Sequence, residues 1–315
     1  MTVDQIVEAG AAPSAPASPA GPARRPRRWT RLRITGALFV LPAALYVLIF
    51  QMVPVIYGFV LSFTDYNPIR RSGPKPIGVE NYARIVTDPE FGNALWVTGR
   101  YVLMVLPATV VLALLLALLV NRPFRGVGLF RSALYVPHIV SLTAVSLVWL
   151  WMYSQHGLFN EILGALGLPD QSWLLDQNTA LTAASAMRIW KALGSNMVLL
   201  LAGLQSIPKE LYEAARVDGA GRWACFRYVT IPGVKPMLTY VIAMDIIFLA
   251  QGFAEIYVLT KGGPLGSTTT VNYLIYTEAF QYNQMGTASA MAFVLFAFII
   301  GFSFLTIRGM TGRQK

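Results

Sequence analysis

The chain has 315 residues, of which 55% are hydrophobic and only 13% are charged. Soluble domains carry about a quarter charged residues. Together with a mean hydropathy of +0.54, this composition excludes an ordinary soluble protein. The formal net charge of +10 requires no nucleic-acid partner, because basic residues also flank membrane spans that face anionic lipid.

The first 33 residues are rich in Ala, Pro and Ser and end in a cluster of Arg. Such a composition buries too little apolar surface to fold, so we expect a disordered tail over residues 1–33. The apolar run over residues 34–64 is far longer than the roughly 7–15 apolar residues of a signal peptide. We therefore expect this run to belong to a membrane span.

Six apolar stretches each come close to the roughly 20 residues that cross a bilayer. They cover residues 37–60, 102–120, 133–152, 179–204, 237–259 and 287–307. The sequence therefore predicts an all-α integral membrane protein, with six transmembrane helices over residues 34–308 and a cytoplasmic tail over residues 309–315. Most Lys and Arg residues fall in the two tails and in alternate loops, and this asymmetry predicts that both termini are cytoplasmic.

Residue types that carry catalytic or metal chemistry are sparse. Cys225 is the only cysteine, and the two histidines, His138 and His156, are far apart. We therefore expect no intrachain disulfide and no metal site built from Cys or His. The sequence also has no G-x-x-x-x-G-K-[ST] pattern for binding ATP phosphates. These observations predict a chain that is not itself an enzyme and that binds no cofactor.

Residues 206–232 form a long charged interruption between the fourth and fifth apolar stretches. Pro208 suits the start of a helix, where its missing N–H does no harm. The run after it, residues 209–218, predicts a helix that Gly219 and Gly221 end in a left-handed conformation. A second short helix over residues 222–229 should stop before Pro232. We expect a two-helix loop at the cytoplasmic face.

The spacing within this loop resembles the EAA signature of permease subunits in bacterial binding-protein-dependent ABC importers. The signature has Glu-Ala-Ala, then Gly, an aliphatic residue and a final Leu-Pro, and this chain carries residues 213–215, Gly219, Val229 and Ile231-Pro232 at the same spacing. Val229 and Ile231 stand where Ile and Leu are usual. Further segments resemble the first permease of carbohydrate importers such as those for maltose, lactose or glycerol 3-phosphate; they are residues 189–191, 196–199, 202–208 and 257–264.

This resemblance covers about residues 35–308 and implies the type I ABC importer permease fold in the bacterial cytoplasmic membrane. It implies four kinds of partner: the lipid bilayer, a second permease subunit, two ABC ATPase subunits and an external substrate-binding protein. ATP and Mg²⁺ would be used by the ATPase subunits. The loop would dock in a cleft on an ATPase, and the residues expected to couple are Glu213, Ala214, Ala215, Asp218, Gly219 and Pro232.

Polar and charged residues also lie inside the fourth and fifth apolar stretches, where they are costly and usually paired or functional. By helical rise, Arg188 and Lys191 reach the depth of Glu255, and Asn196 reaches the depth of Asp245. These residues either brace two helices as structural ion pairs or form a path for a sugar. The candidate path residues are Arg188, Trp190, Lys191, Asn196, Asp245, Gln251, Gly252, Phe253 and Glu255. Relatives often have Gln-Val-Phe-Asp-Gln at 251–255, so the acid is displaced by one position here.

The predicted function is that of a permease subunit of an ATP-driven ABC importer for a sugar or oligosaccharide. A permease for glycerol 3-phosphate or a related polyol phosphate is an alternative, because Arg188 and Lys191 would also suit an anion. An ion-coupled secondary transporter is an alternative from another class, and it predicts inverted repeats and no ATPase-docking loop. The sequence does not name the cargo.

Overall fold

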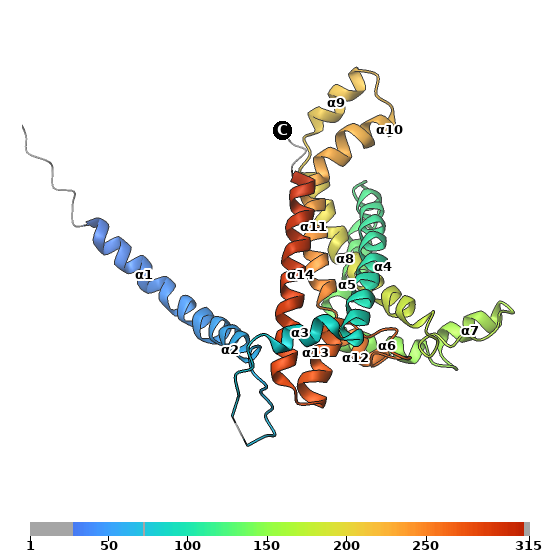
Figure 1. Ribbon diagram of the computed structural model, residues 1–315. Helices are drawn as coiled ribbons and strands as arrows, with labels where there is room; N and C mark the ends of the chain where they lie inside the picture. Colours follow the sequence, from blue (N-terminus) through green and yellow to red (C-terminus); the bar gives the residue numbers. More distant parts are fainter. Residues whose placement is uncertain (1–27, 72, 312–315) are drawn as a thin grey trace, which may run out of the picture. The chain divides into compact units, whose positions relative to one another are not determined.

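The computed structural model describes residues 28–71 and 73–311 (Figure 1). Within these residues the regular structure is helical, apart from one isolated antiparallel bridge between Thr64 and Pro76. The prediction of an all-α protein is confirmed. Residues 1–27 of the expected tail and residues 312–315 lie outside the described part, while α1 begins at Arg28, inside that expected tail. The chain divides into two compact units, up to Val55 and from Ile56 onward.

The first unit contains one long apolar helical run. It comprises α1 (Arg28–Val47), a π-helical turn over Leu48–Met52 and the start of α2 (Val53–Leu61), which continues into the second unit. Pro54 supplies no N–H to the preceding turn, and the π-helical turn lies directly before it. Every side chain from residue 33 to residue 55 is exposed, as expected for a helix whose surroundings are lipid or another subunit.

The second unit is built around four long helices, α4, α8, α11 and α14, which lie side by side (Figure 1). Shorter helices connect them at both ends. The elements are α3 (Glu80–Thr87), α4 (Pro89–Val120), α5 (Val127–Ile139), α6 (Leu142–Met152), α7 (Leu158–Ala165), α8 (Ala180–Gln205), α9 (Lys209–Val217), α10 (Arg222–Cys225), the π-helical turn Phe226–Thr230, α11 (Ile231–Ala250), α12 (Ala254–Leu259), α13 (Val271–Tyr276), the π-helical turn Thr277–Gln281 and α14 (Met285–Thr311).

The predicted count of six spans is not confirmed. Four helical stretches are long and apolar enough to cross a membrane: Arg33–Leu61, Pro89–Val120, Arg222–Ala250 and Met285–Gly309. The third predicted span is instead the pair α5 and α6, bent by 97° at its break. The fourth is α8, which is long enough but carries Arg188 and Lys191. The fifth ends at Ala250 and resumes as α12.

Small residues allow the central helices to approach closely. Ala113 and Ala117 of α4 are fully buried in one cluster with Met197 and Leu200 of α8. Gly194 of α8 faces the backbone of α5, where an added Cβ would lie 2.0 Å from the Leu134 carbonyl oxygen. The contact between α5 and α8 therefore depends on the absence of a side chain at residue 194.

We predict that Gly194→Ala lowers the free energy of unfolding by about 1–3 kcal/mol, because overpacking forces a backbone shift. The measurement is the thermal unfolding of the purified chain in detergent. Gly128→Ala is the matched control, since Gly128 lies in α5 and a Cβ there meets nothing within 4 Å. Equal midpoints for the two variants would contradict this account of α5–α8 packing.

Candidate functional site

The loop over residues 206–232 extends beyond the ends of α4 and α14 (Figure 1). Helix α9 has no buried residue, so Glu213, Ala214 and Ala215 are accessible or half-buried on its surface. Gly219 has φ +81, the left-handed conformation that glycine adopts without steric cost. The Ala220 N–H donates to the Ala215 carbonyl at 2.9 Å, and the Gly219 N–H donates to the Arg216 carbonyl at 3.0 Å. These two bonds form a Schellman motif, and the predicted end of this helix at Gly219 is confirmed. The prediction for Gly221 is wrong, because Gly221 has φ −71 and precedes α10 in extended conformation.

The second half of the loop differs from the sequence expectation. A helix was expected to stop before Pro232, but α10 continues through the π-helical turn into α11. Pro232 lies in the first turn of α11, where its missing N–H is tolerated. The π-helical turn shifts the hydrogen bonds by one residue just before the proline, so the helix does not end there. The loop is therefore joined to α11 by unbroken helix.

Two contacts hold the first part of this loop to the residues around the start of α11. The hydroxyl groups of Tyr212 and Thr230 lie 3.1 Å apart and share a hydrogen bond. The side chain of Ile207 is buried against Gly233, where an added Cβ would lie 2.7 Å from Ile207 Cδ1. Both contacts therefore hold the N-terminal half of α9 against the residues around the start of α11.

A cavity of about 430 Å³ lies between α8, α11 and the break after α5. Asn196 and Asp245 both line it and are in direct contact, since the Asn196 Nδ2 donates to Asp245 Oδ2 at 2.6 Å. The sequence prediction that these two residues lie at matching depth is confirmed. Arg188 and Lys191 line the same cavity.

Lys191 does not pair with Glu255, the residue expected at its depth. Its Nζ donates to the carbonyls of Pro137, His138 and Val140 at 3.0, 3.3 and 2.6 Å. These carbonyls lie at the end of α5, where the helix bends and the next turn cannot supply N–H donors. An ammonium group has three donors, and all three are used here. Lys191 therefore stabilises the bend rather than pairing with Gln251 or Glu255.

Glu255 lies behind the cavity in a buried cluster with α4 and α8. It is 1% exposed, and its Oε1 accepts a hydrogen bond from the Tyr101 hydroxyl at 2.7 Å. Arg188 Nε lies 4.0 Å from the same oxygen, so the expected approach of Arg188 to Glu255 is confirmed. A Cβ on Gly252 would lie 3.1 Å from Tyr101 Cε1 and 3.2 Å from Glu255 Oε1. The glycine leaves room for this cluster.

The remaining candidate path residues do not line the cavity. Trp190 packs against Trp149 with the rings tilted by 50° and their centroids 5.6 Å apart. Gln251 accepts a hydrogen bond from Asn272 through its backbone carbonyl, and Phe253 stacks against Tyr257 with centroids 5.4 Å apart. Four of the nine candidates thus line the cavity: Arg188, Lys191, Asn196 and Asp245.

The sequence reasoning missed several residues that line the cavity. They are His138, Ser195, Tyr240, Met244 and Phe248 among others. Tyr240, Met244 and Phe248 follow each other at intervals of four, so they share one face of α11. This spacing of large side chains on either side of Asp245 is the sequence pattern that could have predicted which face of α11 lines the cavity.

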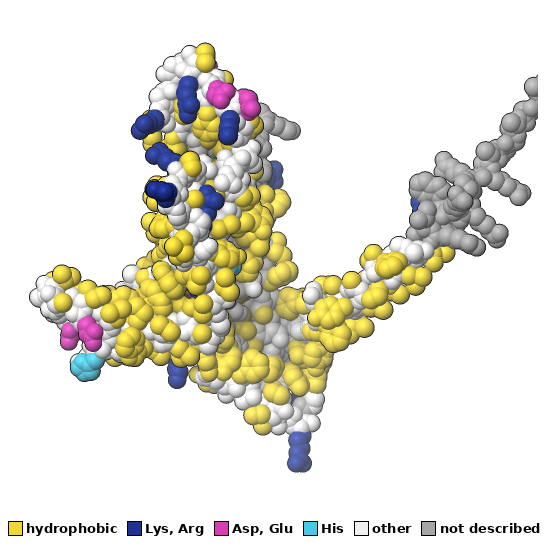
Figure 2. All heavy atoms as spheres, turned by 180° about the vertical axis from the view of Figure 1, so that it is seen from behind, with side chains coloured by type: hydrophobic (Ala, Val, Ile, Leu, Met, Phe, Trp, Pro, Cys, Tyr) yellow, Lys and Arg dark blue, Asp and Glu magenta, His cyan; other side chains and the backbone are white. Residues whose placement is uncertain are grey.

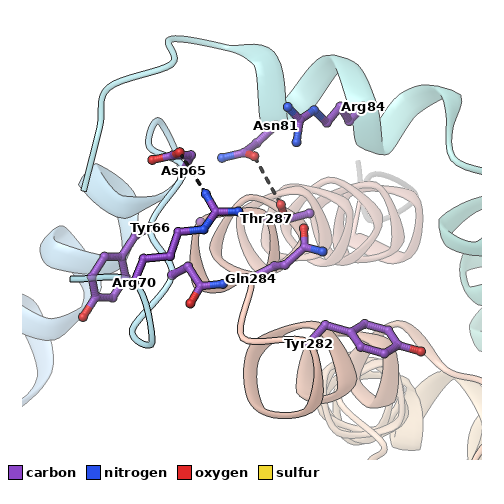
Figure 3. Close-up of a pocket in the computed structure, with 10 residues that line it drawn as sticks. Asp65, Tyr66, Arg70, Asn81, Arg84, Tyr282, Gln284 and Thr287 are labelled. Carbon is purple, nitrogen blue, oxygen red and sulfur yellow. Dashed lines mark hydrogen bonds and ion pairs between the residues drawn. The ribbon is translucent and has the colours of Figure 1, made fainter. Parts of the chain in front are cut away.

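A second, polar pocket of about 460 Å³ lies where the segment after α2 meets the start of α14 (Figure 3). Its floor is fixed by Asn81, whose Nδ2 donates to the carbonyls of Ser62 and Thr64 at 2.9 Å each. The Thr287 hydroxyl donates to Asn81 Oδ1 at 3.2 Å. Asn81 is thus fully engaged in holding the chain together. The charged residues of the lining are Asp65, Arg70 and Arg84, and the two arginines form ion pairs with Asp65 and Glu80.

Residues 91–310 match the model of a protein family described as "Binding-protein-dependent transport system inner membrane component". The chain belongs to this family. It is a multi-pass membrane protein and a permease subunit of the ABC importer class, and the prediction of a transport subunit rather than an enzyme is confirmed.

Curated relatives cover most of the chain. The sulfoquinovosyl glycerol transport system permease protein SmoG of Agrobacterium fabrum is 34% identical over 86% of this chain and 90% of its own. The trehalose/maltose transport system permease protein MalF of Thermococcus litoralis is 33% identical over 87% and 92%. A chain of a bacterial alginate ABC transporter, solved with an alginate pentasaccharide-bound periplasmic protein, matches with TM-score 0.77 and 23% identity over 89% and 96%, which supports the fold.

We predict that Lys191→Met lowers the free energy of unfolding by about 1–3 kcal/mol, because carbonyls at the α5 bend lose their donor. Thermal unfolding of the purified chain measures this change. Lys235→Met is the control, since Lys235 also lies in a long helix but its ammonium group makes no hydrogen bond with the described residues. A midpoint for Lys191→Met equal to that of the control would contradict the assigned role.

Proposed function

We propose that this chain forms half of the translocation path of an ATP-driven importer for a sugar or oligosaccharide. The observation that carries the proposal is the exposed helix α9, with Glu213-Ala214-Ala215 on its surface and Gly219 in a Schellman motif at its end. Relatives named for trehalose/maltose, arabinooligosaccharide and lactose transport support a carbohydrate cargo.

Helix α9 docks in a cleft on a separate ATPase subunit. Ala214 and Ala215 are small and permit close approach, while Glu213 and Asp218 offer carboxylates to basic groups of the partner. Because α9 follows α8 after the short link 206–208 and the loop runs on into α11, closure of two ATPase subunits on ATP moves both helices. The cavity lies between those helices, so the movement changes access to it.

The end of the molecule that carries α9 faces the cytoplasm of a bacterium. Lys and Arg side chains gather over α9, α10 and the neighbouring helix ends (Figure 2), and such an excess marks the cytoplasmic side of a membrane protein. Both termini lie on that side in the cytoplasmic membrane. The complete importer contains a second permease, two ATPases that use ATP and Mg²⁺, and an external binding protein.

The cavity between α8 and α11 receives the cargo. Asn196, Asp245 and Ser195 offer donors and acceptors for sugar hydroxyls, while Tyr240 and Phe248 offer ring faces. This mixture of a few polar groups with aromatic rings is typical of small-molecule sites. Arg188 lines the same cavity, and its positive charge would suit an anion. A polyol phosphate is therefore the alternative cargo. No observation favours an ion-coupled secondary transporter, because the matching family is dependent on binding proteins.

We predict that Gly219→Val uncouples transport from ATP hydrolysis, because a β-branched residue cannot adopt φ +81 without strain. The test compares ATPase activity and sugar uptake of the full transporter recovered with this chain. The expected result is retained ATPase activity with uptake reduced about tenfold or more. A tenfold reduction corresponds to a free-energy difference of about 1.4 kcal/mol. Normal uptake would refute the coupling role, and failure to recover any ATPase with the wild-type chain would refute the proposed function.

We further predict that Ser195→Leu blocks the path while leaving the transporter assembled. Ser195 lines the cavity, and its hydroxyl bonds only the carbonyl of Ala192 in its own helix. Uptake of radiolabelled maltose, trehalose and lactose should fall about tenfold or more. Val198→Leu is the control, since Val198 is exposed on α8 outside the cavity. If both variants transport at the wild-type rate, the cavity is not the path.

A further inference from the structure

A third pocket, of about 590 Å³, lies where the end of α6, the segment between α7 and α8 and the turn after α12 meet. It is separate from the cavity between α8 and α11 and from the polar pocket at the start of α14, because it shares no lining residue with either. Its volume falls within the range of about 300–1,000 Å³ that is typical of small-molecule sites. The pocket therefore has the size of a ligand site.

Asn160 of α7 fixes the walls of this pocket. It is 3% exposed, and its Nδ2 donates to the carbonyls of Gln155 and Gln171 at 3.2 Å each. Its Oδ1 accepts hydrogen bonds from the Gln171 N–H and from the Trp173 Nε1, both at 3.0 Å. One buried side chain thus joins the segments on either side of α7, so the pocket is held in shape by the protein itself.

Three polar side chains of the lining are free to bind a ligand. Gln155, Asp170 and Ser172 are exposed. The hydrogen bonds of Gln155 and Ser172 to described residues use their backbone carbonyls, and Asp170 forms no ion pair within the described part of the chain. An amide, a carboxylate and a hydroxyl together offer both donors and acceptors, as the hydroxyl groups of a sugar require.

Trp173 supplies an aromatic ring beside these polar groups. Its indole N–H is bound to Asn160, and its ring packs against Tyr153 with centroids 5.8 Å apart. The Tyr153 hydroxyl in turn donates to the Ala183 carbonyl of α8 at 2.9 Å, so the ring is held from two sides. A fixed aromatic ring offers a large apolar contact area. A pyranose has C–H groups on its face and hydroxyls at its edge, and this lining fits both.

The charge of the lining discriminates between the two candidate cargoes. Of the described residues that line the pocket, only Asp170 is charged. A carboxylate repels a phosphate group, and the lining has no Lys or Arg to offset that repulsion. The pocket therefore favours a neutral saccharide over a polyol phosphate, whereas the cavity that Arg188 lines suits either.

The pocket lies at the end of α8 opposite the loop that carries α9. The segment that lines it leads into α8, whose 26 residues span about 39 Å before the loop begins. Figure 1 shows α6, α7 and α12 at the end away from α9 and α10. Helix α6 also connects the two sites, because Leu142 lines the cavity and Leu150 lines the pocket, about 12 Å further along the helix.

We propose that this outer pocket binds a neutral saccharide and holds it before it enters the cavity between α8 and α11. Gln155, Asp170 and Ser172 bind its hydroxyls, and Trp173 contacts the face of its ring. This inference rests on the proposed function, because it takes the α9 end of the molecule as cytoplasmic and the opposite end as the side from which the cargo arrives.

The test measures saccharide binding to the full transporter, purified with its partner subunits but without the external binding protein. Maltose, trehalose, lactose and glycerol 3-phosphate are titrated separately and followed by saturation-transfer-difference NMR. All variants are made in a Ser195→Leu background, which fills the cavity and leaves the outer pocket open. Asp170→Ala and Gln155→Ala remove free polar groups of the pocket. Glu161→Ala and Gln177→Ala are the matched controls, since both residues are exposed nearby and lie outside the lining.

The expected result is that at least one of the three disaccharides binds, and that Asp170→Ala and Gln155→Ala each weaken its binding about fivefold through the loss of a hydrogen bond. The two controls should bind like the parent, and glycerol 3-phosphate should not bind. Equal affinities in pocket and control variants, or no binding of any disaccharide, would overturn the proposal.

A protein occupant would give a different result. If Asp170→Ala weakened association of the external binding protein but left saccharide affinity unchanged, the pocket would be a protein contact and the proposal would be wrong. Failure of the proposed function has its own readout, the absence of an ATPase from the purified transporter, so the two failures are distinguishable.

Discussion

Broken helices leave backbone carbonyls that must find donors, and this requirement shapes the second unit. Inside a bilayer no water is available to satisfy such groups. At the bend between α5 and α6, Lys191 donates to three carbonyls. At the break between α11 and α12, Thr270 donates to the Gly252 carbonyl at 3.0 Å and Asn272 to the Gln251 carbonyl at 2.9 Å. Lys191 of α8, and Thr270 and Asn272 in the segment after α12, thus hold interrupted helices in place.

The hydrogen-bond partners of each charged residue distinguish the structural charges from those that line the cavity. Lys191 and Glu255 have their partners within the protein, whereas Arg188 lies between the two groups: it lies close to Glu255 and also lines the cavity. Helices α8 and α11 carry the cavity at mid-length and the charged loop at their ends. In the proposed function this arrangement matters, because a movement imposed at the loop would reach the cavity through the same pair of helices.

The sequence predicted the features that depend on local chemistry. Gly219 ended its helix as expected, because a left-handed glycine cap needs only neighbouring backbone groups. Asn196 met Asp245 because helical rise alone fixes their depth. The partner of Lys191 was not predictable, since carbonyls freed at a bend have no signature in the side-chain sequence. The helix through Pro232 was also missed, because a π-helical turn absorbs the disruption that proline usually causes. Trp190 and Phe253 were placed on the candidate sugar path, whereas tertiary packing places them in aromatic clusters.

The most direct test of the central claim is a distance measurement between α9 and the ATPase subunit. Ala215→Cys in a Cys225→Ser background gives the chain a single thiol on α9, and a short thiol-to-amine crosslinker then reports its neighbours in the assembled transporter. A matched thiol at Leu175, which is exposed in the segment between α7 and α8, is the control. The account predicts a product that joins this chain to the ATPase from residue 215 and none from residue 175. No ATPase product from residue 215, or equal products from both positions, would contradict it.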